Sequence, residues 1–186
     1  MITALILIDI QNDYFPGGKM ELAGSMEASL NAQKILEKFR LENKLIVHIQ
    51  HFSQREGATF FLPDTDGVEI RETAKPRENE KVIVKHFPNS FRDTALLPYL
   101  KDNEVSNLVI AGMMTHMCVD ATTRTAKDLG FNCIVIGDAC ATKDLEWSGS
   151  RVKATEVQTA FLSALNYFYS TVMTTEQYLS MDFIDY

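Results

Sequence analysis

The sequence is poor in the residues that mark several protein classes. It contains three cysteines, five prolines and one tryptophan in 186 residues. The cysteines, at positions 118, 133 and 140, form neither an even disulfide framework nor a CxxC metal pair, which favours a reducing compartment. No apolar run approaches the roughly 20 residues that cross a bilayer. The short run at residues 4–8 has no basic flank and does not predict a signal peptide. We therefore expect a cytoplasmic protein.

Positive charge is also scarce. Lysine and arginine number 18 against 25 aspartates and glutamates, which gives a formal net charge of −7. This balance argues against nucleic acid or an anionic membrane as partner, because both attract cationic surfaces. Hydrophobic residues make up 46% and charged residues 23%, as in ordinary globular domains. We expect a single domain over residues 1–186 whose partner is a small-molecule substrate.

Short apolar runs alternate with segments typical of amphipathic helices. The predicted strands are residues 3–8, 45–49, 82–84, 108–111, 132–136 and 171–173. The predicted helices cover about 25–42, 94–101, 113–129 and 151–168, with a brief one from 175. This alternation indicates an α/β fold with a parallel sheet and helices on both faces. The connection 51–80 is long enough for a lid or for a contact to a second subunit, so we expect a homo-oligomer, either dimer or tetramer.

Three chemically reactive side chains follow predicted strands. Asp9, Lys85 and Cys118 each lie just beyond a strand, and ligands of parallel sheets bind at that edge. A cysteine near a helix start gains backbone donors and a lowered pKa. We therefore predict Cys118 as nucleophile, Asp9 as base, and Lys85 as the cation that keeps Asp9 ionised and stabilises the thiolate. The backbone N–H groups of Met114 and Cys118 are the expected oxyanion donors.

Each of these residues also has an ordinary structural explanation. Cys118 could be a small core residue, Asp9 a turn residue and Lys85 a solvated charge. A thiol-reactive protein without turnover and a silent binding module that retains the fold are the alternatives to an enzyme. The combination favours the enzyme, because a binding module does not need a lysine and an aspartate behind a thiol. Gln11, Phe15 and Trp147 are predicted to line the substrate pocket.

Three segments resemble the signature blocks of the isochorismatase-like cysteine hydrolases: residues 7–15, 85–91 and 112–119. That superfamily includes nicotinamidases, N-carbamoylsarcosine amidohydrolases and isochorismatases. The resemblance implies a three-layer, Rossmann-like sandwich with a six-stranded parallel sheet of order 3-2-1-4-5-6. It also implies an Asp9–Lys85–Cys118 triad and a cis peptide bond that maps to Met113–Met114. The implied reaction is cleavage of a C–N bond in a small amide, lactam or carbamoyl compound through a Cys118 thioester.

The resemblance is incomplete where nicotinamidases bind a metal. Those enzymes carry an Asp-x-His pair after the second strand, whereas this chain reads Ile-Gln-His-Phe-Ser over residues 49–53. His48 and His51 are three residues apart, on a strand and its exit, and need not converge. We therefore expect no metal and no other cofactor. Nicotinamidase-like and isochorismatase-like activities remain alternatives, and the likeness is closer to the nicotinamidase-related hydrolases.

Overall fold

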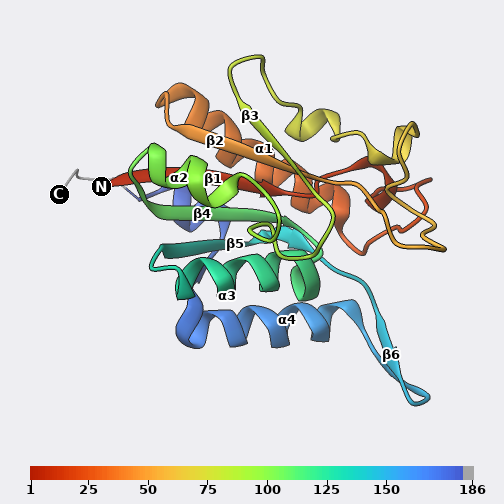
Figure 1. The fold of residues 1–186 in the computed structure, drawn as a ribbon. Coiled ribbons are helices and arrows are strands. Elements are labelled where there is room, and N and C mark those ends of the chain that lie inside the picture. The colour runs from red at the N-terminus through yellow and green to blue at the C-terminus, as the bar shows by residue number, and fades with distance from the viewer. Residues whose placement is uncertain (182–186) are drawn as a thin grey trace.

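The computed structural model describes residues 1–181, which contain a six-stranded parallel sheet (Figure 1). Its strands are β1 (Ile2–Ile8), β2 (Leu45–His51), β3 (Lys81–Lys85), β4 (Val105–Met113), β5 (Asn132–Ala141) and β8 (Thr171–Met173). They lie in the order β3-β2-β1-β4-β5-β8. Because β8 is the sixth strand of this sheet along the chain, the predicted order 3-2-1-4-5-6 and the α/β fold class are confirmed.

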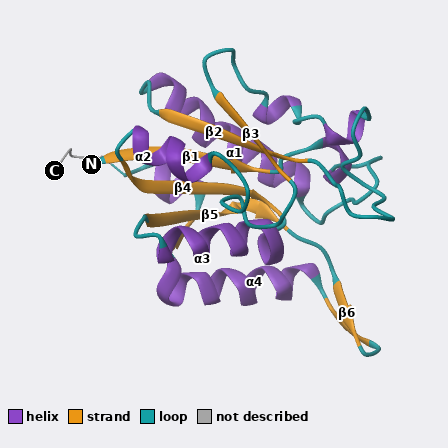
Figure 2. Ribbon diagram, viewed as in Figure 1, coloured by secondary structure: helices purple, strands orange, loops and turns teal. Residues whose placement is uncertain are grey.

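Helices cover both faces of the sheet (Figure 2). They are α1 (Ser25–Leu41), α2 (Leu96–Asp102), α3 (Asp120–Asp128), α4 (Ala154–Ala164) and α5 (Thr175–Leu179). α1 and α5 pack on one face, α2 and α3 on the other, and α4 lies beside α3 (Figure 1). No helix within residues 1–181 is long and apolar enough to span a membrane.

The central strand β1 shows why the strands of this sheet have continuous apolar sequences. Leu5 and Leu7 point into the core formed with α1, while Ala4, Ile6 and Ile8 point into the core on the opposite face. All five side chains are buried. A parallel strand covered on both faces has no solvated side, so its sequence does not alternate.

The junction between β4 and the following helix differs from the sequence prediction. A helix was expected to follow Gly112, but β4 continues to Met113 because it pairs with β1 up to Gly112 and with β5 up to Met113. The chain then makes a π turn, Thr115–Val119, before α3 begins at Asp120. Gly112 has a φ of 135°, and a Cβ there would overlap the carbonyl of Ile8. Glycine is therefore required where β4 passes closest to β1.

Two further segments were not predicted. β5 runs five residues past the predicted end at 136, to Ala141. Residues 146–149, expected as a loop, and the first two residues of the helix predicted over 151–168 instead belong to β6 (Leu145–Trp147), β7 (Ser150–Val152) and the turn between them. These strands form an antiparallel hairpin that projects from the body of the molecule (Figure 1). The long connection after β2 contains only two short 3-10 turns, Asp66–Val68 and Glu72–Ala74.

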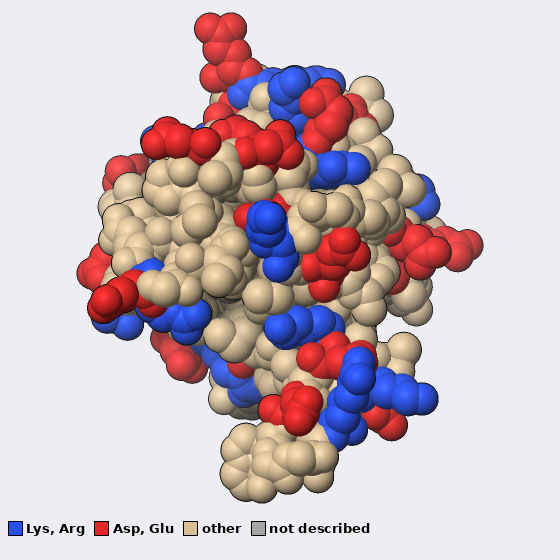
Figure 3. Space-filling view, turned by 90° about the vertical axis from the view of Figure 1, so that its right-hand side faces the viewer, with Lys and Arg blue, Asp and Glu red and all other residues tan. Residues whose placement is uncertain are grey.

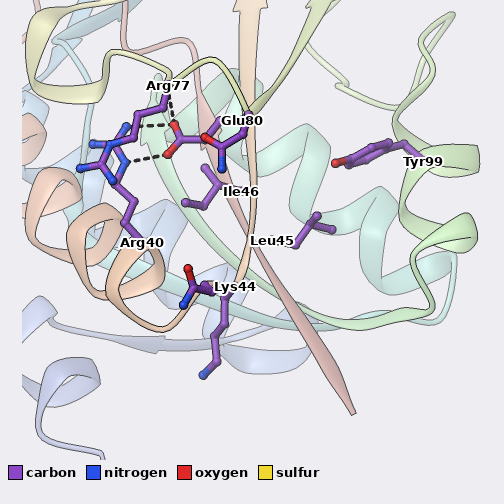
Figure 4. A pocket seen from close by; sticks show the side chains of 9 residues that line it. Arg40, Lys44, Leu45, Ile46, Arg77, Glu80 and Tyr99 are labelled. Atoms are coloured by element: carbon purple, nitrogen blue, oxygen red, sulfur yellow. Dashed lines mark hydrogen bonds and ion pairs between the residues drawn. The ribbon is translucent and has the colours of Figure 1, made fainter.

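An ion cluster fixes the start of β3 against α1, beside a hollow of about 280 Å³ (Figure 4). Glu80 Oε1 accepts a hydrogen bond from Arg40 Nε at 2.6 Å, and Oε2 accepts from Arg40 Nη2 at 2.9 Å. The backbone N–H of Arg77 donates to the same Oε2 at 2.9 Å, as does His48 Nε2 at 2.8 Å. Burial alone would raise the pKa of Glu80, but these donors outweigh it and lower the pKa to about 2.

Replacing Glu80 with glutamine is expected to destabilise the protein by about 3 kcal/mol, because it removes the more buried of the two carboxylates that pair with the Arg40 guanidinium, the other being Glu37. Because the pKa of Glu80 is lower in the folded than in the unfolded protein, its carboxylate stabilises the fold fully above the unfolded-state pKa. This contribution to stability is lost as the pH falls toward 2. The difference between wild type and Glu80→Gln in urea unfolding should therefore shrink below about pH 4. The control is Glu72→Gln, which removes an exposed pair with Lys75. Equal effects of the two substitutions would contradict this assignment.

Candidate active site

The structure brings Asp9, Lys85 and Cys118 together at the carboxyl edge of the sheet. Asp9 follows β1, Lys85 ends β3, and Cys118 lies in the π turn after β4. Lys85 Nζ is 2.7 Å from Asp9 Oδ2 and donates to Cys118 Sγ at 3.3 Å. The side chains of Asp9 and Lys85 have no exposed surface, and Cys118 is 5% exposed. The alternative explanation of Lys85 as a solvated charge is therefore wrong.

The charges in this cluster depend on one another. Burial lowers the pKa of Lys85, but nearby Asp9 and Cys118 raise it, and the net effect is a raised pKa. Lys85 is therefore an ammonium at neutral pH. Burial raises the pKa of the Cys118 thiol, and Asp9 raises it further, which outweighs the opposite effect of Lys85. The expectation that a helix start lowers this pKa is wrong, because burial of the thiol disfavours its charged form. Cys118 holds its proton at rest.

His51 is the residue of this cluster that sequence reasoning missed. It is the last residue of β2, which lies between β1 and β3, and it is the register partner of Lys85. Lys85 Nζ lies 2.8 Å from His51 Nδ1. The strand-end rule that selected Asp9 and Lys85 applies equally to His51. His48, by contrast, points away to Glu80, so the two histidines do not converge, as the sequence indicated.

The cluster does not fit a metal ion. Asp9, His51 and Cys118 each present a ligand atom, and these atoms lie within 4.8 Å of one another. However, Lys85 Nζ contacts all three groups. The lysine ammonium thus takes the position at which these ligands converge, and a second cation there would be repelled by it.

A cavity of about 290 Å³ opens beside Cys118. Its aromatic wall comes from Tyr14, Phe60 and Phe61. Met114 and Met117 line it on the cysteine side, and the Met113–Met114 peptide bond is cis, as the family resemblance implies. Figure 3 views the edge of the molecule that carries this site, where acidic and basic side chains are interspersed. The face therefore lacks the one-sign charge that suits a polyanionic partner.

The three predicted pocket residues lie elsewhere. Phe15 is fully buried in the core, with the Arg71 guanidinium 4.8 Å from its ring. Gln11 is buried beneath His51 and bonds to its backbone. Trp147 is 83% exposed at the turn of the projecting hairpin. None of them lines the cavity beside Cys118. The prediction was wrong because sequence order alone does not indicate which aromatic residues of the long connection after β2 fold over the site.

Comparisons with known proteins agree with this architecture. The Isochorismatase domain model matches residues 3–177. The uncharacterised isochorismatase family protein YddQ of Bacillus subtilis is 50% identical over 179 residues, which cover 96% of this chain and 99% of YddQ. An isochorismatase hydrolase structure from Oleispira antarctica is 46% identical, with a TM-score of 0.93 and 97% of each chain covered. Streptothricin hydrolase of Streptomyces noursei is 31% identical over 145 residues, 77% of this chain and 56% of that protein. The chain therefore belongs to the isochorismatase family of hydrolases.

Proposed function

We propose that this protein is a cysteine amidohydrolase that cleaves a C–N bond of a small amide, lactam or carbamoyl compound. The observation that carries the proposal is the buried Lys85 ammonium, which contacts both Asp9 and Cys118 beside an open cavity. A protonated thiol next to a carboxylate has its general base in place. The similarity to a relative named streptothricin hydrolase also supports hydrolysis of a small molecule.

In the first half of the reaction, Asp9 removes the proton from Cys118 Sγ as the sulfur attacks the substrate carbonyl carbon. The carbonyl π electrons move to oxygen, and the backbone N–H groups of Met114 and Cys118 bind this oxyanion. When the carbonyl re-forms, the C–N bond breaks. The leaving nitrogen takes the proton from Asp9, and the acyl group remains on Cys118 as a thioester.

In the second half, water attacks the thioester and Asp9 accepts its proton. The C–S bond breaks as the new tetrahedral centre collapses, and the sulfur regains a proton from Asp9. One water is consumed, and the products are an acid and an amine. Lys85 keeps Asp9 ionised between steps and lowers the energy of the thiolate as it forms, since an opposite charge favours the charged form of each group.

The state of the thiol argues against the redox alternative. Cysteines that sense oxidants are low-pKa and solvent-accessible. Burial instead raises the pKa of Cys118, and only a small fraction of the residue is exposed. A thiol of this kind becomes nucleophilic only when a neighbouring base takes its proton. The single domain, the cytoplasmic location and the homo-oligomeric state stay predictions.

A panel of primary amides, lactams and N-carbamoyl compounds tests this function. We expect at least one compound to gain one water, with ammonia or an opened ring as product, detected by coupled assay and mass spectrometry. Activity should survive prolonged treatment with a chelator, because Lys85 takes the place that a metal would need. Absence of turnover across the panel, or activity that a chelator removes and a metal restores, would contradict the proposal.

A further inference from the structure

The hydrogen bonds around Lys85 determine the tautomer of His51. A lysine ammonium has three N–H donors and no acceptor. Lys85 Nζ contacts Asp9 at 2.7 Å, His51 Nδ1 at 2.8 Å and Cys118 Sγ at 3.3 Å. Because the ammonium can only donate, Nδ1 of His51 must accept and cannot carry a proton. The proton of the neutral ring therefore resides on Nε2.

Protonation of this ring is strongly disfavoured. Burial is the largest effect that lowers the pKa of His51, and the nearby Lys85 and His86 lower it further. Asp9 opposes them, and the resulting pKa is about 4. The imidazole is therefore neutral through the physiological pH range. Since Nδ1 is occupied and a second cation beside Lys85 is costly, His51 is unsuited to act as a general base.

Contacts from Gln11 and Phe61 hold His51 in place, and one nitrogen of its ring remains without a hydrogen-bond partner among the described residues. Gln11 Nε2 donates to the His51 carbonyl at 2.9 Å, and Gln11 Oε1 accepts from the His51 backbone N–H at 2.7 Å. Phe61 packs against the imidazole, with ring centroids 5.8 Å apart. His51 lines the cavity beside Cys118. Its Nε2 has no hydrogen-bond partner within residues 1–181.

We propose that His51 is a specificity-determining donor, whose Nε2–H binds an acceptor on the substrate other than the carbonyl that Cys118 attacks. This inference rests on the proposed amidohydrolase function, in which Met114 and Cys118 take the scissile carbonyl oxygen. The site then selects amides that carry a second carbonyl or carboxylate oxygen close to the cleaved bond. A simple amide leaves the Nε2–H donor unpaired in the occupied cavity, and such mismatches reduce binding and turnover.

The tautomer is tested first and requires no substrate. Long-range ¹H–¹⁵N NMR of the wild-type protein resolves its four histidines, and His51→Gln identifies the signals of His51. We expect the Nε2–H tautomer, with no titration between pH 8 and about pH 5, because the pKa is lowered to about 4. An Nδ1–H tautomer, or titration near pH 6.5, would overturn the proposal.

The donor role is tested with acetoacetamide and butyramide, neutral amides that differ by one carbonyl in place of a methylene. Wild type should favour acetoacetamide. His51→Asn keeps an oxygen near Nδ1 for Lys85 but lacks a donor at the Nε2 position. We therefore expect it to lower the kcat/KM of acetoacetamide relative to that of butyramide about tenfold. An unchanged ratio would overturn the donor role, and the intrinsic reactivity of each amide cancels in the comparison.

Failure of the proposed function can be distinguished from failure of this inference. If wild type hydrolyses neither amide, both compounds are titrated into Cys118→Ala protein, which retains His51. Tighter binding of acetoacetamide that a second substitution, His51→Asn, abolishes would support the donor role without turnover. Equal binding of the two amides would overturn it.

Discussion

Replacing Cys118 with alanine is expected to reduce hydrolysis of any identified amide by about four orders of magnitude or more. The substitution removes the atom that would form the thioester, and loss of a nucleophile is not compensated by the rest of a site. The measurement is kcat under saturating substrate, with the fold checked by circular dichroism. Residual turnover comparable to wild type would refute the nucleophilic role.

Cys133 and Cys140 provide matched controls for this experiment. Both are buried thiols in β5, and burial raises the pKa of each to about 12. Neither lies within the cluster of Asp9, Lys85 and Cys118. Cys133→Ala and Cys140→Ala should each retain kcat within about threefold, because removing one buried sulfur affects packing more than chemistry. A loss as large as that of Cys118→Ala in either variant would show that the effect is structural.

The second large effect is expected at Lys85. Its ammonium is the cation that contacts Asp9 and Cys118, and unit charges 4 Å apart interact by about 4 kcal/mol at an effective dielectric of 20. Lys85→Ala should therefore lower kcat by about two to three orders of magnitude. Lys85→Arg should restore little activity, because the planar guanidinium is bulkier and directs its donors differently.

Alkylation reports the same effect without a substrate. In a Cys133→Ala/Cys140→Ala background, only Cys118 can react with iodoacetamide. Lys85 lowers the pKa of Cys118, so Lys85→Ala should shift alkylation of Cys118 to higher pH. The control is Lys81→Ala at the start of the same strand, where the ammonium lies over Tyr99 instead. Identical alkylation profiles for wild type and Lys85→Ala would mean that Lys85 does not influence the thiol.

The sheet and the convergence of the cluster were predictable from sequence because they depend on local patterns. The apolar runs of β1 and β4 are long and uninterrupted, as buried parallel strands require. Once the sheet is parallel, a general rule places the residues after its strands on one edge. Asp9, Lys85 and Cys118 follow from that rule without any knowledge of loop structure.

The pocket and the state of the thiol were not predictable in this way. Phe60 and Phe61 reach the cavity through a long connection whose path depends on tertiary contacts such as the bond from the Phe61 N–H to Asp13, at 2.6 Å. Phe15 ends the first signature segment and Trp147 follows the fifth predicted strand, but Phe15 packs into the core and Trp147 projects on a hairpin. The pKa of Cys118 depends on the burial of its thiol, and a position near a helix start in the sequence does not predict that burial.

Rapid-quench mass spectrometry tests the central claim most directly. Wild-type protein is mixed with an identified substrate, quenched in acid at successive times and digested with trypsin. We predict that the peptide containing Cys118 gains the mass of the acyl group, that hydroxylamine removes it and yields a hydroxamate, and that Cys118→Ala shows no adduct. Steady hydrolysis with that peptide unmodified at every quench time, and with no hydroxamate formed, would contradict a thioester mechanism at Cys118.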